Sequence, residues 1–425
     1  MLDINLIRNE PERVRNALLK KGWDFNPVEL LTLDEKRREI RFIVEETKAK
    51  LNKLSASVPV VKKAGGDINE IFKEVKALKL ENEEREKTLK ILDDQVLDIL
   101  VALPNMPDED LLPGEKENNK VVHTFGKRPE YHFKIKDHVE LCESLGIIDY
   151  KRAAKISGSG TWIYTGIGAQ LEWALLNFFI TEHLKAGYEM ILPPHILNYE
   201  SGFTAGQFPK FKEDVFWLEG TEPQKFLLPT SETALVNFHR DEILKADELP
   251  RKYFAYTPCY RKEAGSYRTE ERGMIRGYQF NKVEIFQYTK AEDSHKAFEE
   301  MVLHAQGLVE KLGLHFQVSK LAAGDCSHGM ARTYDIEVFI PSMNIYKEVS
   351  SVSNARDYQA RRGMARYRDE ETNQVKYLHT LNGSGLATSR LIPAIVEQFQ
   401  QADGSVLVPK VLQPFLGVSV LHIKD

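Results

Sequence analysis

Arginine, glutamate and phenylalanine recur at strand spacing in CYRKEAGSYRTEERGMIRGYQFNKVEIF, residues 259–286. Side chains two positions apart on a β-strand point to the same face. The residues that share a face in this way are Arg261 and Glu263 in the first run and Arg276, Phe280 and Glu284 in the second. If the two runs pair across the loop at 264–273, guanidinium groups, an aromatic ring and carboxylates meet in one patch.

Such a patch has the chemistry to bind a phosphorylated ligand. Arginine offers phosphate a planar and permanently charged fork, an aromatic ring can stack on a base, and a carboxylate can hold an ammonium group. A surface hairpin with cross-strand ion pairs has the same residue pattern, so the spacing alone leaves both interpretations open.

The elements that position these residues belong to an α+β chain. From about residue 111, β-rich runs such as KYFAYTPCYRKE, YQFNKVEIFQY and TYDIEVFIP are separated by helical stretches. Many hairpin-like connections between such runs predict a mainly antiparallel sheet flanked by helices. The sequence contains no Walker A loop, G-x-G-x-x-G or H-E-x-x-H motif, which disfavours the standard nucleotide-binding folds.

The first hundred residues carry a different pattern, an apolar seam whose spacing alternates four and three. Its positions are 40, 44, 47, 51, 54, 58 and 61, with Thr47 polar, and then 68, 71, 75, 78, 82, 85, 89, 92, 96 and 99, with Asn82 and Arg85 polar. We expect an antiparallel pair of helices over about 28–100, roughly 45 Å long at 1.5 Å per residue. A proline and two glycines place its tip at about 58–66. Asn82 and Arg85 either fix the register or face water, and neither is expected to bind a ligand.

The first helix of this pair is basic, although the whole chain is acidic. Residues 36–63 hold nine Lys and Arg against three Glu, whereas the formal net charge of the chain is -5. The overall charge argues against nucleic-acid binding by bulk attraction, but a rigid basic rod can follow a phosphate backbone without reading bases. A solvated helical face is the simpler explanation when this helix is considered by itself.

Composition and terminal sequence predict a soluble cytosolic protein. The 425 residues are 42% hydrophobic, enough to fill the core of a large domain and a smaller one. The cysteines Cys142, Cys259 and Cys326 lie far apart, which fits a reducing compartment and offers no C-x-x-C pair for zinc. The N-terminus lacks the apolar core of a signal peptide, and no apolar run is long enough to span a membrane.

Five collinear segments resemble the class II aminoacyl-tRNA synthetases, in the form found in bacterial-type seryl-tRNA synthetase. They are GAQLEWALLNFFITEHLKAGYEMILPP at 168–194 (motif 1), LLPTSE at 227–232, CYRKEAGSYRTEERGMIRGYQFNKVE within 254–286 (motif 2), EVSSVSNARDYQARR at 348–362, and TLNGSGLATSRLIPAIVEQFQQADGSVLVPKVLQPFLG, which holds motif 3 at 380–400. The family also carries an N-terminal helix pair, so the likeness covers essentially the whole chain. It implies a tRNA-binding arm at 1–103 and a catalytic domain at 104–425.

The resemblance implies a two-step reaction. Serine attacks the α-phosphate of ATP to give seryl-adenylate and pyrophosphate, and the terminal ribose of tRNA then takes the serine. The implied catalytic residues are Arg261, Glu348 and Arg390. The implied ATP-binding residues are Arg261, Lys262, Glu263, Arg276, Phe280, Glu348, Val349, Ser350, Ser351 and Arg390.

Within that set the resemblance gives each group a task. Arg261 contacts the α-phosphate, Arg276 and Arg390 hold the outer phosphates, and Phe280 and Glu263 bind adenine. Positive groups held in a dry site stabilise the charge that builds on the α-phosphate. Glu348 and Ser351 match the Mg²⁺ positions of the family, and their oxygens are donors that magnesium accepts.

The implied serine pocket follows a physical rule, because a site built to hydrogen-bond a hydroxyl rejects an analogue that lacks it. Its residues are Thr230, Ser231, Glu232, Arg261, Glu284, Asn382 and Ser384. A helix cap at Thr230 and Glu232 and a turn at Asn382 would explain three of them without a ligand. Their occurrence together with motif 2 favours binding.

The remaining implications concern partners. The arm grips the long variable arm of tRNA(Ser), through residues that here are Arg41, Lys48, Lys50 and Lys53. Family membership also suggests tRNA(Sec) as a substrate and a homodimer that includes the apolar helix at 171–180. No zinc and no membrane are expected.

The chain departs from the family pattern at a few positions, which leaves the fine substrate affinity open. These are Gly160, where arginine is usual, Thr233 and Ala234, where Val-Pro is more common, Tyr278, where histidine is common, and Val352 and Ala355, which replace frequent cysteines. The sequence leaves three alternatives. A paralogue that loads a carrier protein would generally lack the arm, a sister synthetase for threonine or proline would bring a further domain, and a non-catalytic RNA-binding homologue would have lost the arginines.

Overall fold

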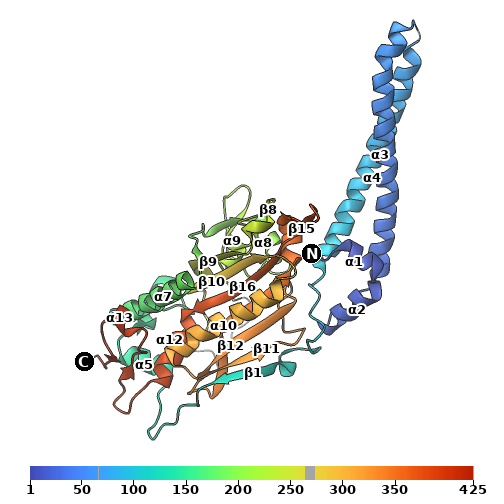
Figure 1. Cartoon of the computed structure of the whole chain (residues 1–425). Coiled ribbons are helices and arrows are strands. Elements are labelled where there is room, and N and C mark those ends of the chain that lie inside the picture. The colour runs from blue at the N-terminus through green and yellow to red at the C-terminus, as the bar shows by residue number, and fades with distance from the viewer. Residues whose placement is uncertain (66, 264–272, 425) are drawn as a thin grey trace. The chain divides into compact units, whose positions relative to one another are not determined.

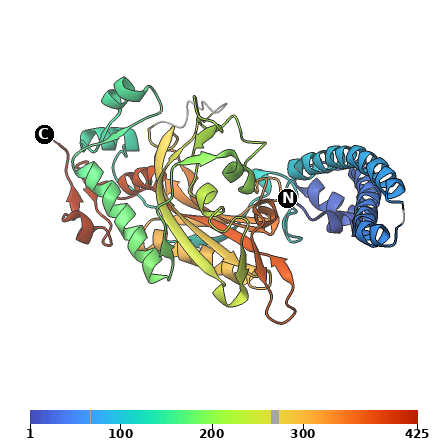
Figure 2. The same ribbon diagram turned by 90° about the horizontal axis from the view of Figure 1, so that it is seen from above.

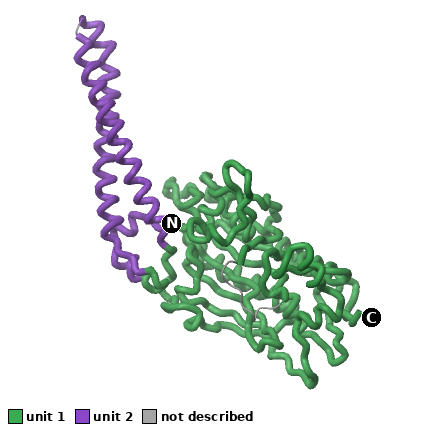
Figure 3. The backbone as a smooth tube through the Cα atoms, turned by 180° about the vertical axis from the view of Figure 1, so that it is seen from behind, with its two compact units in different colours: residues 1, 17–23, 104–425 green, residues 2–16, 24–103 purple. Residues whose placement is uncertain are grey.

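The computed structural model describes residues 1–65, 67–263 and 273–424, which form two compact units (Figure 3). We call residues 2–16 and 24–103 the helical unit, and residue 1 with 17–23 and 104–425 the sheet unit. In the described ranges, no helix is long and apolar enough to cross a membrane.

The helical unit is dominated by two long helices, α3 (Pro27–Lys63) and α4 (Asn69–Ala102), which run side by side in Figures 1 and 3. The short helices α1 (Ile4–Asn9) and α2 (Pro11–Lys20) precede them. Helix α3 starts where the Asn26 side chain accepts a hydrogen bond from the Val28 amide, with proline as its first residue. The long pair confirms the predicted antiparallel hairpin.

The seam between α3 and α4 follows the predicted spacing, because Val44, Thr47, Leu92 and Val96 are buried along it. The polar Asn82 is also buried, at 5% exposure. It therefore lies inside the seam and does not face water, which was the other expected position. Arg85 crosses the seam and donates from Nη1 to the Thr47 hydroxyl over 3.4 Å.

The hairpin is longer than expected. Helix α3 continues through Pro59 for four more residues, so the turn is narrower than the predicted 58–66. Proline removes only one amide donor, and Val61 beyond it still packs half-buried against the seam. With 37 and 34 residues, the helices are about 55 and 51 Å long at 1.5 Å per residue.

The sheet unit is built on an eight-stranded sheet in the order β1-β11-β12-β13-β16-β10-β9-β4. Every neighbouring pair is antiparallel except β4 with β9, which confirms the mainly antiparallel sheet. The strands are β1 (Lys120–Phe125), β4 (Glu189–Met190), β9 (Arg251–Tyr260), β10 (Gln279–Thr289), β11 (Phe316–Lys320), β12 (Arg332–Ile340), β13 (Ile345–Arg356) and β16 (His379–Ala387).

Within the described residues, four small sheets accompany the large one. They are formed by β2 (Ile148–Asp149) with β3 (Ile163–Tyr164), by β5 (Ile196–Asn198), β6 (Trp217–Leu218) and β7 (Lys225–Leu227), by β8 (Ile243–Lys245), β14 (Arg366–Arg368) and β15 (Val375–Tyr377), and by β17 (Val406–Leu407) with β18 (Val420–Leu421). The helices of this unit are α5 (His138–Ser144), α6 (Tyr150–Ser157), α7 (Ile167–Lys185), α8 (Tyr199–Thr204), α9 (Glu232–Leu235), α10 (Ser294–Leu312), α11 (Tyr358–Gly363), α12 (Thr388–Gln398) and α13 (Gln413–Leu416).

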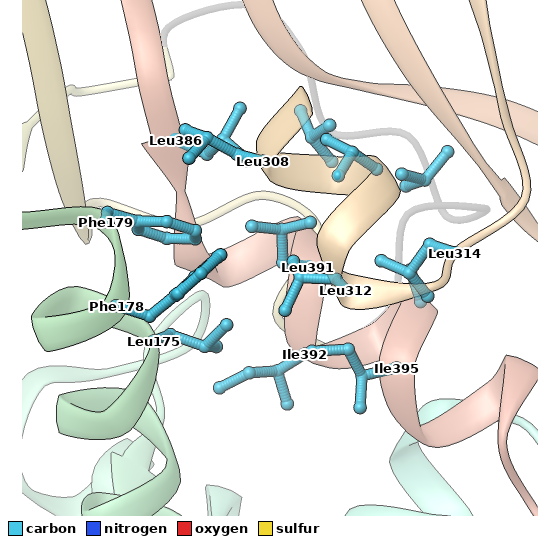
Figure 4. Close-up of a cluster of buried hydrophobic side chains, with 14 of the residues drawn as sticks. Leu175, Phe178, Phe179, Leu308, Leu312, Leu314, Leu386, Leu391, Ile392 and Ile395 are labelled. Carbon is cyan, nitrogen blue, oxygen red and sulfur yellow. The ribbon is translucent and has the colours of Figure 1, made fainter. Parts of the chain in front are cut away.

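Helices α10 and α12 cover one face of the large sheet (Figure 1), and α13 lies beside α7 in both Figures 1 and 2. Figure 4 shows where their apolar side chains meet: Phe178 and Phe179 of α7 lie near Leu308 and Leu312 of α10 and Leu391 and Ile392 of α12. Burying these side chains removes a large apolar area from water, which holds the helices on this face.

Polar side chains lie on the face of the large sheet opposite these helices, because side chains alternate along each strand. On β10, Val283 and Ile285 belong to the core under the helices, so Lys282 and Glu284 point to the other face. The same alternation directs polar side chains of β12, β13 and β16 away from the helices. These are Thr333, Asp335, Ser351, Ser353, Asn382 and Ser384, and all six line one cavity.

Candidate active site

Two connected hollows lie on that polar face of the sheet unit. The larger cavity has a volume of about 610 Å³ and the smaller one of about 90 Å³. Both are lined by Arg261, Glu263, Arg276, Lys282, Glu348 and Ser384, which we call the shared wall. Thr230, Glu232 and Asn382 line only the larger cavity, and Phe280, Val349 and Arg390 only the smaller one.

The predicted hairpin of motif 2 positions the shared wall. Strands β9 and β10 pair with Phe280 opposite Cys259 and Glu284 opposite Ala255, and the Arg261 amide donates to the Tyr278 carbonyl over 3.0 Å. The guanidinium carbon of Arg261 lies 5.1 Å from the centre of the Phe280 ring. The connecting residues 264–272 lie outside the described residues, but the pairing itself confirms the convergence of the two runs.

Carboxylates and hydroxyls cluster at the larger cavity. The Thr230 hydroxyl donates to Oε2 of Glu284 over 3.5 Å, and the Asn382 amide donates to Oε1 of Glu284 over 3.3 Å. Lys282 donates from Nζ to the Thr230 hydroxyl over 2.7 Å and forms an ion pair with Glu284. Lys282 is 6% and Glu284 1% exposed, so this ion pair is shielded from water.

Glu232 lies beside that ion pair, and a side chain of α11 hydrogen-bonds its carboxylate. Its Oε1 accepts a hydrogen bond of 2.8 Å from the Gln359 side chain on α11. Burial and the charge of Glu284 raise the pKa of Glu232 to about 7, against the opposing effects of Gln359 and Lys282. Any cation that enters the cavity favours the ionised form of this carboxylate.

Arginines dominate the other side of the shared wall. The Nε of Arg276 pairs with the Glu263 carboxylate. Arg390 donates from Nη1 to the Glu348 carbonyl over 2.7 Å and lies 3.5 Å from its carboxylate. These side chains come from β13, from α12 and from the segments flanking 264–272, and together they form a cationic patch with carboxylate partners.

Oxygen donors gather next to Glu348. Ser351 stands opposite Asp335 across β12 and β13, and its hydroxyl hydrogen-bonds the Asp335 carboxylate. The Oδ1 atom of Asp335 is buried with no hydrogen-bond partner, and burial together with the charge of Glu348 raises its pKa. Among the described residues, no three His, Cys, Asp or Glu side chains form a metal cluster, so any cation here needs additional oxygen ligands.

Four predicted site residues do not line either cavity. The hydroxyl of Ser231 is buried against that of Thr257 at 2.6 Å, and the Ser350 hydroxyl donates to the Ser384 carbonyl over 2.6 Å. The Lys262 amide binds the Asp214 carbonyl, and its side chain is exposed. Glu284 is the fourth, and it reaches the larger cavity only through Thr230, Lys282 and Asn382.

The candidate tRNA-binding residues lie on α3 of the helical unit and are exposed. Arg41, Lys48 and Lys50 form ion pairs with acidic residues of α4, over 2.6 Å to Asp93, 2.8 Å to Glu86 and 2.7 Å to Glu74. Exposed ion pairs of this kind contribute only about 0–1 kcal/mol, so a phosphate backbone can displace the acids at small cost.

Sequence reasoning missed Lys282, Asp335 and Gln359. Lys282 carried a usable signal, because it shares strand parity with Phe280 and Glu284. Asp335 and Gln359 carried none, since their relevance comes from partners that only the fold brings near.

Two departures from the family pattern prove to be neighbours. The Tyr278 amide donates to the Gly160 carbonyl over 3.3 Å, and a Cβ atom added at Gly160 would lie 3.3 Å from the Tyr278 ring. Gly160 has a φ of +77°, which an arginine adopts only with strain. The tyrosine ring therefore occupies the space next to this glycine.

The chain is similar to known proteins over its full length. Residues 1–107 match the seryl-tRNA synthetase N-terminal domain and residues 216–399 the class II tRNA synthetase core domain (G, H, P, S and T). It is 61% identical to a serine–tRNA ligase of Clostridium acetobutylicum, over 98% of this chain and 99% of that one, and 41% identical to that of Thermodesulfovibrio yellowstonii, over 99% and 100%.

A solved structure agrees with these matches. The seryl-tRNA synthetase of Pyrococcus horikoshii, crystallised with ATP, superposes with a TM-score of 0.91 at 32% identity, covering all of both chains. The matches span both units. The chain therefore belongs to the seryl-tRNA synthetase family of class II aminoacyl-tRNA synthetases.

Proposed function

We propose that serine and ATP react in the two connected cavities to give seryl-adenylate and pyrophosphate. The protein then transfers serine to the 3′ end of tRNA(Ser). The observation that carries this proposal is the shared wall. It presents Arg261 between a cavity rich in carboxylates and hydroxyls and a cavity rich in arginines. An amino acid on one side and a triphosphate on the other would meet at this residue.

In the proposed first step, serine enters the larger cavity with its ammonium toward Thr230, Glu232 and Glu284. A carboxylate oxygen of serine forms a bond to the α-phosphorus of ATP, while the bond from that phosphorus to the oxygen of pyrophosphate breaks. Arg261 stabilises the charge that builds on the α-phosphate, and Arg276 and Arg390 hold the departing pyrophosphate. No proton transfer to the leaving group is required, because pyrophosphate leaves as an anion.

Recognition of serine rests in this proposal on buried polar groups. Asn382 and Ser384 line the larger cavity beside Glu284, and both are less than 10% exposed. Alanine would leave these groups without a hydroxyl partner, and threonine would add a methyl group to a confined space.

The adenine of ATP is assigned to the smaller cavity, with Phe280 as the stacking surface and Glu263 as an acceptor for the amino group. Arg261 already lies over the Phe280 ring, so binding of the base requires the guanidinium group to share or leave that face. Val349 lines this cavity, and Ser350 supports the shared wall through the Ser384 carbonyl.

Magnesium fits the oxygens of Glu348 and Ser351. The unpartnered Oδ1 of Asp335 beside them supports a site for a hard cation, and two protein oxygens leave room for phosphate and water ligands. When bound, the ion would neutralise charge on the phosphates of ATP.

The helical unit is assigned to tRNA, through Arg41, Lys48, Lys50 and Lys53 on the basic face of α3. The proposal includes tRNA(Sec), because the family reads the long variable arm and not the anticodon. We also propose a homodimer through motif 1, where α7 exposes Trp173 at 52%. A cytoplasmic location is proposed as well, and it is supported by three cysteines that form no disulfide. Light scattering measures the assembly state directly.

Serine-dependent exchange of pyrophosphate into ATP tests the proposal, with charging of purified tRNA(Ser) as the second assay. Arg261→Ala should lower the exchange rate about 10²- to 10³-fold, the usual loss when one preorganised transition-state contact is removed. Exposed Arg152→Ala on α6 is the matched control and should leave the rate unchanged. A wild-type protein without serine-dependent exchange would instead support the non-catalytic homologue.

A further inference from the structure

Lys282 is a buried cation at the centre of the two cavities, and the proposed mechanism gives it no task. It is 6% exposed and belongs to the shared wall, so its side chain faces both the larger and the smaller cavity. Its Nζ donates to the Thr230 hydroxyl over 2.7 Å and pairs with Oε2 of Glu284.

Those two partners are the groups assigned above to the ammonium of serine. Thr230 also accepts from the Glu232 amide over 3.2 Å, and Oε1 of Glu284 accepts from Asn382. Side chains of the protein itself therefore fill the positions around Thr230 and Glu284. A second ammonium cannot occupy the same place, so serine must replace Lys282 there.

The charge of the cavity explains why a lysine would hold this place. Glu232 and Glu284 are buried side by side, and a buried carboxylate without a counter-charge is strongly disfavoured. Serine brings one positive and one negative charge. If its ammonium takes the place of Nζ at Glu284, its carboxylate can pair with the displaced Nζ, so Glu284 and Lys282 each keep a partner of opposite charge.

Lys282 has somewhere to move. Lys282 and Arg261 both line the shared wall, where the proposed mechanism puts the serine carboxylate and the α-phosphate. The four-carbon stem of lysine is flexible, and its ammonium binds as a point charge that does not need a fixed orientation.

We propose that Lys282 is a positioning residue that occupies the ammonium site while the amino acid is absent and then shifts to pair with the serine carboxylate. This inference rests on the proposed function of the larger cavity. It predicts that Lys282 discriminates between amino acids with and without a free carboxylate, which a purely structural lysine would not do.

Calorimetric titration of the ATP-free protein with serine and with serinamide tests the inference, at about pH 6.5, where both amino groups are mostly protonated. We expect Lys282→Met to reduce the preference for serine over serinamide roughly ten- to hundredfold, the worth of one charge-assisted hydrogen bond. Lys282→Arg, which retains the charge, should preserve part of that preference. Lys296→Met, an exposed lysine on α10, is the control and should behave as wild type.

An unchanged ratio of the two affinities in Lys282→Met, with both ligands weakened equally, would overturn the inference and leave Lys282 a structural residue. Lys282→Gln gives the same comparison if the methionine variant does not fold, because it can still hydrogen-bond Thr230 without carrying charge. A wild-type protein that binds neither ligand would overturn the proposed function, and the inference with it.

Discussion

Gln359 offers a sharp test of how the serine pocket is supported, because it is fully buried and joins three partners. Its Nε2 donates to Glu232 over 2.8 Å and to the Ala205 carbonyl over 3.0 Å, and its Oε1 accepts from the Thr380 hydroxyl over 2.6 Å. Gln359→Leu keeps most of the volume and removes all three hydrogen bonds.

The expected magnitude follows from these contacts. A buried group left without its partner costs about 1–3 kcal/mol, and neighbouring losses are not additive, so we expect destabilisation of about 3–4 kcal/mol in total. The loss also removes a hydrogen bond that lowers the pKa of Glu232, so that pKa rises further above about 7. At neutral pH the carboxyl is then more protonated, and the KM for serine should rise roughly tenfold, the effect of about 1.4 kcal/mol.

Denaturant unfolding measures the first effect, and pyrophosphate exchange at varied serine and ATP measures the second. The KM for ATP should stay unchanged, because Gln359 does not line the smaller cavity. Gln306→Leu on α10 makes the same exchange at a half-buried glutamine whose Nε2 donates to Glu310, and it should alter neither quantity. Wild-type stability together with a wild-type KM for serine in Gln359→Leu would refute the reasoning.

Two further predictions concern the arm and the proton balance of the pocket. Reversing Lys48, Lys50 and Lys53 to glutamate should weaken aminoacylation while pyrophosphate exchange stays intact, because α3 lies in the helical unit and the cavities lie in the sheet unit. Equal loss in both assays would contradict this division. Burial and the charge of Glu284 raise the pKa of Glu232 to about 7, and an entering ammonium group lowers this pKa. Serine binding should therefore release part of a proton near pH 6.5 and should tighten as the pH rises through 7. Calorimetry in two buffers of different ionisation enthalpy measures this release, and its absence would show that Glu232 does not titrate on binding.

The sequence alone determined the local features of this protein. The alternating four and three spacing identified the helix pair, because a seam with that period can be buried only between two helices. Strand parity placed Arg261 with Glu263 and Phe280 with Glu284 on common faces, and the structure confirms that β9 and β10 bring these runs together. The motifs identified the family, since five segments in one order rarely arise from local structure alone.

Only the tertiary structure decided which groups touch. Lys282 donates a hydrogen bond to Thr230, 52 residues away, and Glu232 accepts one from Gln359, 127 residues away. Ser384 stands opposite Glu284 in the pairing of β10 with β16, and the register of that pairing shifts between Lys282 and Glu284. Parity fixes the face of a side chain but not its neighbour, because pairing between distant strands depends on the packing of the whole sheet and on irregularities that no local pattern reveals.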